Sequence, residues 1–114
     1  MGASIYKLSA ADRGPIGEVG EVPVGAHYRL VSVSVRFAIA PVTSEPLTIT
    51  LDAAAGPAWD VLLYTVDPGA GGITDLVWQP DEELFFEGGD EVLVAYANTD
   101  TRDWALQITF KRVM

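Results

Sequence analysis

The stretch Arg29–Ala40, RLVSVSVRFAIA, decides the fold class of this chain. Its apolar residues recur at every second position, which is the period of a β-strand and not of a helix. The alternation predicts one apolar face, formed by Val31, Val33, Val35, Phe37 and Ile39. It predicts a second, more polar face, formed by Leu30, Ser32, Ser34, Arg36 and Ala38. The stretch is therefore expected to be one long, half-buried strand.

The same kind of pattern continues along the chain and predicts an all-β domain. Further strands are expected at 16–24, 47–53, 59–66, 75–79, 84–86, 91–98 and 104–113. Breakers such as Gly56-Pro57, Asp67-Pro68 and Gly88-Gly89 separate these segments and leave no room for crossover helices. About eight short strands of this kind are typical of an antiparallel two-sheet β-sandwich with a jelly-roll-like order.

Individual segments lead to more detailed expectations. Segment 16–24 should be an edge strand, because Pro23 removes a backbone donor. Segment 59–66 is apolar on both faces, which indicates a central strand or one whose outer face meets a neighbour. Segments 91–98 and 104–113 should pair as a hairpin, and the latter should turn Trp104, Leu106, Ile108 and Phe110 inward.

Length and composition indicate one folded domain. The chain has 114 residues, of which 49% are hydrophobic and 20% charged, a balance typical of a packed core. We expect residues 15–114 to form the sandwich and residues 1–14 to form an N-terminal arm that orders on a partner. The sequence contains no cysteine, no apolar segment long enough to span a membrane and no pattern of a secretory signal. Synthesis in a cytoplasm, with no membrane partner, is the expectation.

The charge argues against nucleic acid as a partner. The net charge is −9, and residues 45–114 carry thirteen acidic and only three basic groups. Phosphate backbones are bound by lysine and arginine, so this chain would repel them. The acidic surplus is interpreted as a solubilising face, with docking onto a basic partner surface as the alternative.

No residue pattern indicates catalysis, a cofactor or a metal. His27 is the single histidine, and no Gly-x-Ser-x-Gly elbow accompanies the five serines. The acidic stretch 81–91 lacks the spacing of a calcium loop, so a solvated loop is favoured over a calcium site. We therefore expect no enzyme, no catalytic residue, no cofactor and no metal ligand.

The aromatic residues are the candidates for partner contacts. In Phe85-Phe86, adjacent strand positions point to opposite faces, so one ring should face outward. Trp78 lies near a predicted strand end and could serve as an interface anchor or as a platform for a sugar. With Ile5 and Tyr6 of the arm, the expected contact residues are Ile5, Tyr6, Trp78, Phe85 and Phe86.

The run from Leu47 to Phe110 resembles a group of small proteins encoded in tailed-phage genomes. The resemblance rests on residues 50–68 (TLDAAAGPAWDVLLYTVDP), 74–81 (TDLVWQPD), 88–100 (GGDEVLVAYANTD) and the closing apolar strand. It covers a little over half of the chain and leaves the first 46 residues outside. The resemblance implies a jelly-roll-like virion component without catalytic or cofactor residues.

Two roles follow from that resemblance as expectations. The first is a capsid decoration (cement) protein on the virion surface, which bridges and stabilises subunits of the major capsid protein and forms a homo-oligomer such as a trimer. The alternative is a carbohydrate- or receptor-binding module of a phage tail or head fibre.

Overall fold

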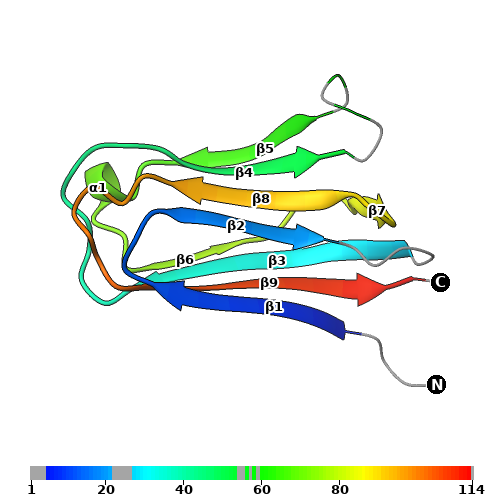
Figure 1. The fold of residues 1–114 in the computed structure, drawn as a ribbon, viewed down its shortest axis with the longest axis horizontal. Helices are drawn as coiled ribbons and strands as arrows, with labels where there is room; N and C mark the ends of the chain where they lie inside the picture. The colour runs from blue at the N-terminus through cyan, green and yellow to red at the C-terminus, as the bar shows by residue number, and fades with distance from the viewer. Residues whose placement is uncertain (1–4, 22–26, 54–55, 57, 59, 114) are drawn as a thin grey trace.

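The chain folds into a sandwich of two antiparallel sheets (Figure 1). A computed structural model describes residues 5–21, 27–53, 56, 58 and 60–113, without the side chains of residues 5–8. Sheet A contains β1 (Ile5–Asp12), β9 (Trp104–Arg112), β3 (His27–Phe37), β6 (Asp75–Trp78) and β7 (Phe85–Glu87). Sheet B contains β2 (Ile16–Glu21), β8 (Glu91–Tyr96), β4 (Leu47–Asp52) and β5 (Val61–Val66), and one short helix, α1 (Pro68–Gly71), follows β5.

The strand order is that of a jelly roll. Sheet A runs β1-β9-β3-β6 and sheet B runs β2-β8-β4-β5. Both β6 and β7 pair with β3, β6 along Val33–Arg36 and β7 along His27–Arg29. They are two halves of one strand position, so the nine strands of the described residues occupy eight positions, as in a jelly roll. The expected fold class is confirmed.

The core lies between the two sheets and contains the inward faces that the alternation predicts. Trp104, Leu106, Ile108 and Phe110 of β9 are all buried, as expected. They pack with a cluster from both sheets that includes Leu30, Val33, Val35, Phe37, Leu47, Ile49, Phe86, Val92, Val94 and Tyr96. Edge-on contacts join the rings of Phe37 and Tyr96 across the sheets, with centroids 5.5 Å apart.

The faces predicted for β3 are wrong at both ends of the segment. The pairing of β3 with β9 shifts register between Leu30 and Ser32, which makes Val31 the extra residue of a β-bulge. The bulge turns Leu30 inward, where it is 1% exposed, and leaves Val31 only half-buried. At the other end, β3 stops at Phe37, and Ile39 lies in the following loop with 63% of its surface exposed.

The predicted hairpin of the last two strands is also wrong. β8 pairs with β2 and β4 in sheet B, whereas β9 pairs with β1 and β3 in sheet A. The connection between them crosses from one sheet to the other. Buried Asn98, which has a φ of 52°, holds this crossing by donating to the carbonyls of Arg13, Gly14 and Arg102.

The edge strands differ from expectation in two places. Segment 16–24 supplies the expected edge strand, β2, although residues 22–26 lie outside the described part of the chain. Ile5–Asp12, which the sequence pattern assigns to an arm outside the sandwich, forms β1 and pairs with β9 along its whole length. Segment 59–66 supplies β5, whose one hydrogen-bonded neighbour among the described strands is β4, so β5 is an edge and not a central strand.

Candidate interaction surfaces

The end of the sandwich that carries α1 is held together by carboxylates. Asp100 accepts hydrogen bonds from the backbone N–H groups of Val42 and Thr43, at 2.9 and 2.8 Å, and from the Thr43 hydroxyl. These bonds lower the pKa of Asp100. Asp67 accepts from the Ser44 hydroxyl and from the N–H of Ala70, and these bonds likewise lower its pKa.

The same loops approach each other very closely. Glu45 accepts from the N–H and hydroxyl of Thr99, at 3.0 and 2.6 Å. A Cβ added at Gly69 would lie 1.9 Å from the Thr43 carbonyl oxygen, so only glycine fits there. Three of the thirteen acidic groups of residues 45–114, Glu45, Asp67 and Asp100, therefore fasten loops 41–46, 67–70 and 98–101 to one another. It is a structural network and offers no open set of ligands.

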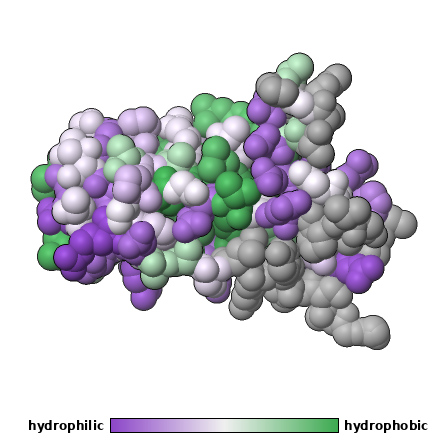
Figure 2. Space-filling view, viewed as in Figure 1, coloured by the Kyte–Doolittle hydropathy of each residue, from purple (hydrophilic) through white to green (hydrophobic). Residues whose placement is uncertain are grey.

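The outer face of sheet B carries a row of four paired residues across its four strands, three of them apolar and one a threonine. Val19 of β2 is the partner of Leu93 of β8, Leu93 is the partner of Thr50 of β4, and Thr50 is the partner of Leu62 of β5. Val19 and Leu62 are 47% and 57% exposed, and Leu93 is half-buried. Hydrophobic surface accordingly gathers over the middle of β2 and β8, between more hydrophilic areas (Figure 2). We call Val19, Leu93, Thr50 and Leu62 the apolar row.

An acidic row lies directly beside the apolar row. Glu21 of β2, Glu91 of β8 and Asp52 of β4 are Cα partners across the three strands. Burial and the neighbouring charges of Asp52 and Glu21 raise the pKa of Glu91. Like charges placed opposite one another destabilise a sheet, so these three positions reduce the stability of the isolated chain.

A groove opens where β5 and β6 form one edge of the sandwich. Its floor is apolar and consists of Leu62, Leu63, Tyr64, Trp78 and Leu84. The ring of Trp78 stacks on that of Tyr64, with centroids 5.6 Å apart and planes 20° apart, and so joins the edge of sheet A to that of sheet B. Gln79, Pro80, Asp81 and Glu82 form the rim, and the groove has a volume of about 460 Å³. We call it the edge groove.

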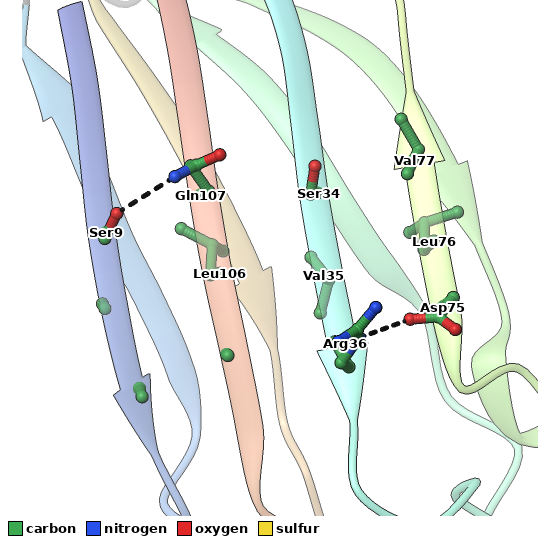
Figure 3. Close-up of a pocket in the computed structure, with 12 residues that line it drawn as sticks. Ser9, Ser34, Val35, Arg36, Asp75, Leu76, Val77, Leu106 and Gln107 are labelled. Carbon is green, nitrogen blue, oxygen red and sulfur yellow. Dashed lines mark hydrogen bonds and ion pairs between the residues drawn. The ribbon is translucent and has the colours of Figure 1, made fainter.

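The outer face of sheet A is hollowed across β1, β9, β3 and β6 (Figure 3). Ser9, Gln107, Ser34 and Val77 form one row across the four strands, and Gln107 donates to Ser9 at 3.5 Å. Next to this row, the Arg36 guanidinium pairs with Asp75 at 2.7 Å. The hollow has a volume of about 650 Å³ and is wide and shallow, because small side chains form its floor.

The expected contact residues are placed in three different environments. Phe85 is 58% exposed and Phe86 is 1% exposed, which confirms that one ring of the pair faces outward. Phe86 packs edge-on against Phe110 and belongs to the core, so Phe85 alone of the two is available to a partner. Trp78 is half-buried in the edge groove.

The two expected arm residues, Ile5 and Tyr6, lie in β1, and their side chains are outside the described part of the structure. The three expected residues whose side chains are described, Trp78, Phe85 and Phe86, do not form one surface, because Phe86 lies in the core.

Sequence reasoning missed the apolar row. Val19 lies in a segment that also contains two glycines and two glutamates, and Leu62 lies in a segment that is apolar on both faces. The second feature is a usable signal, because an edge strand that is apolar on both faces leaves one apolar face exposed. Among the described residues, no three histidine, aspartate or glutamate side chains gather as a metal site, and no helix has the length and apolar character to cross a membrane.

Comparison with known proteins identifies no family. No protein-family model matches the sequence, and no curated protein is similar to it. Among solved structures, the chain is similar to one described as the structure of Tomato aspermy virus by X-ray crystallography. The match has 14% sequence identity and a TM-score of 0.29, and it covers 98% of this chain and 79% of that chain.

Proposed function

We propose that this chain is a structural protein of a virus particle, a decoration protein that binds neighbouring subunits of the major capsid protein and stabilises the assembled shell. The observation that carries this proposal is the exposed apolar row of sheet B with the acidic row beside it. Exposed apolar side chains gathered on one face of a sheet are typical of a protein–protein interface. The resemblance of residues 47–110 to small tailed-phage proteins gives the partner in this proposal, since a jelly-roll fold alone does not imply a function.

The surface chemistry suits binding and not turnover. A sheet face with apolar side chains beside a row of charges has the elements of an interface core and rim. The acidic row lowers the stability of the free chain, and a basic surface on the partner would relieve that repulsion. Binding to the assembled lattice alone would stabilise that lattice by mass action. A symmetric oligomer would add several weak contacts together.

The test is binding of the purified chain to empty capsids that lack it, followed by electron cryomicroscopy of the decorated particles. We expect density for this domain at fixed symmetry positions on the head. Val19→Lys should reduce occupancy at least about tenfold, because it places a charge in the apolar row. Val77→Lys is the matched control, since Val77 is 64% exposed but lies on the outer face of sheet A. No density on the head, or equal loss with both variants, would refute the proposal.

A carbohydrate-binding role is the second candidate, and the edge groove favours it. Sugars are bound by an aromatic face together with polar groups, and the groove places Trp78 near Gln79, Asp81 and Glu82. A glycan array probed with the wild-type chain and with Trp78→Ala tests this candidate. Glycan binding that the substitution abolishes would support it, and tight binding to capsids that free sugars do not inhibit would count against it.

A further inference from the structure

β5 is the least protected edge strand in the described part of the sandwich. Its six residues, VLLYTV, include no charge, glycine or proline, and Val61 and Leu62 are about half exposed. Natural sheets protect their edges with charges, prolines, very short strands or bulges. The other edges follow this rule: β1 contains Lys7 and Asp12, β2 contains Glu18 and Glu21, and β6 and β7 are four and three residues long. The one protection of this kind in β5 is a bulge at Leu63, where its pairing with β4 shifts register.

The bulge connects β5 to the edge groove. In a regular strand, Leu63 and Tyr64 would point to opposite faces, yet both pack against the core cluster. Leu62 consequently belongs both to the apolar row of sheet B and to the lining of the edge groove. A strand added beside β5 would extend the apolar row on one of its faces and place its alternate side chains over the groove.

The negative charge around β5 indicates which kind of partner strand could pair with its free edge. Asp81 and Glu82 stand on the rim of the edge groove, and Asp60 and Asp67 flank β5 in the sequence. A two-fold antiparallel pair of β5 strands, centred on the strand, would place Asp60 of one copy opposite Asp67 of the other. It would also bring together two chains of net charge −9. These repulsions disfavour a second copy of this chain and favour a basic partner.

We propose that β5 receives an extended segment of a partner protein as an added strand of sheet B, and that lysine or arginine alternates with apolar residues in that segment. Backbone hydrogen bonds to the β5 edge provide the docking, as in other cases of strand addition. The apolar side chains extend the apolar row beside Leu62, and the basic side chains on the other face lie over the edge groove, within reach of Asp81 and Glu82. The inference rests on the proposed function only for the partner's identity as a capsid subunit.

The probe is a short synthetic peptide of alternating lysine and valine, titrated into the isotope-labelled chain and followed by amide NMR and hydrogen exchange. We expect shifts and slowed exchange at the amides of β5. Leu62→Lys should weaken binding at least about tenfold, and the double change Asp81→Asn with Glu82→Gln should weaken it several-fold at low salt. Val77→Lys is again the control and should bind as the wild type does. Thermal unfolding of each variant verifies that these exposed substitutions leave the fold intact.

Two further peptides separate strand addition from plain charge attraction. A lysine–valine peptide with alternate N-methylated amides keeps its charge but cannot pair as a strand, and it should not bind. A glutamate–valine peptide should not bind either. The proposal would be overturned if either of these two peptides bound as well as the lysine–valine peptide, or if the lysine–valine peptide did not bind at millimolar concentration. It would also be overturned if the amide shifts were centred on sheet A, or if the free chain formed a dimer that Leu62→Lys dissociates. Capsid decoration that survives Leu62→Lys would overturn this inference while leaving the proposed function intact.

Discussion

Phe85→Ala and Phe86→Ala form a matched pair that tests the register of β7. The two residues are neighbours and chemically identical, yet Phe85 is 58% exposed and Phe86 is 1% exposed. Phe86 also contacts Phe110 edge-on, with ring centroids 5.6 Å apart. Removing a buried phenylalanine ring costs about 3–5 kcal/mol of unfolding free energy, because apolar contacts are lost and a cavity remains. Removing an exposed ring changes it by roughly 0.5 kcal/mol.

Urea and thermal unfolding followed by circular dichroism measure this difference. An unfolding entropy of about 2.1 cal/mol/K per residue gives about 0.24 kcal/mol/K for a chain of this length, so each kcal/mol shifts the Tm by about 4 °C. Phe86→Ala should therefore lower the Tm by about 12–20 °C, and Phe85→Ala by about 2 °C. Equal effects would mean that β7 does not cover the core. A reversed order would mean that β7 is shifted by one residue, which moves every side chain to the other face.

Three further predictions concern single polar groups. Tyr96→Phe should leave the unfolding free energy unchanged or raise it by up to about 1 kcal/mol, because the buried hydroxyl has no hydrogen-bond partner in the part of the chain that the structure describes; a large loss in urea unfolding would show that the hydroxyl is satisfied. Burial and nearby carboxylates raise the pKa of that hydroxyl to about 12, so spectrophotometric titration should show one tyrosine that ionises late, and this titration should be missing in Tyr96→Phe. Glu91→Gln should raise the unfolding free energy at pH 7 by roughly 0.2–1 kcal/mol. Because the pKa of Glu91 is raised in the folded chain, its charge opposes folding at neutral pH, and the gain should disappear at acidic pH where the carboxyl is protonated; a gain that persists in acid would refute this reasoning. Asp100→Ala should lower the Tm at pH 7, because the hydrogen bonds from Val42 and Thr43 hold the pKa of this carboxyl below its ordinary value. The stabilisation by the Asp100 carboxylate is present above its unfolded pKa of about 4 and is lost as pH falls through its lower pKa in the folded chain, so the Tm difference between Asp100→Ala and the wild type should close over that range. The control is Asp12→Ala, at an exposed position, which should change the Tm little.

The sequence also predicts part of the candidate surface. Alternation within a strand is local, so the opposite orientations of Phe85 and Phe86 could be expected from their adjacency alone. The apolar row could not be expected in this way. Val19, Leu93 and Leu62 are far apart in the sequence and become neighbours only through the pairing of β2 with β8, β8 with β4 and β4 with β5.

By itself the sequence determined the all-β class, the approximate positions of the strands other than β1 and the inward face of β9, because each depends on the two-residue period of a pleated strand and on breakers between strands. Tertiary structure alone decided which strands are neighbours. β8 and β9 are consecutive and have the pattern of a hairpin, yet they lie in different sheets, since Asn98 turns the chain across the sandwich. Long-range strand pairing also set the bulge at Val31 and the edge position of β5. The alternation of apolar and polar side chains indicates which face of a strand is buried. Register and strand order are set by long-range pairing, which no local pattern specifies.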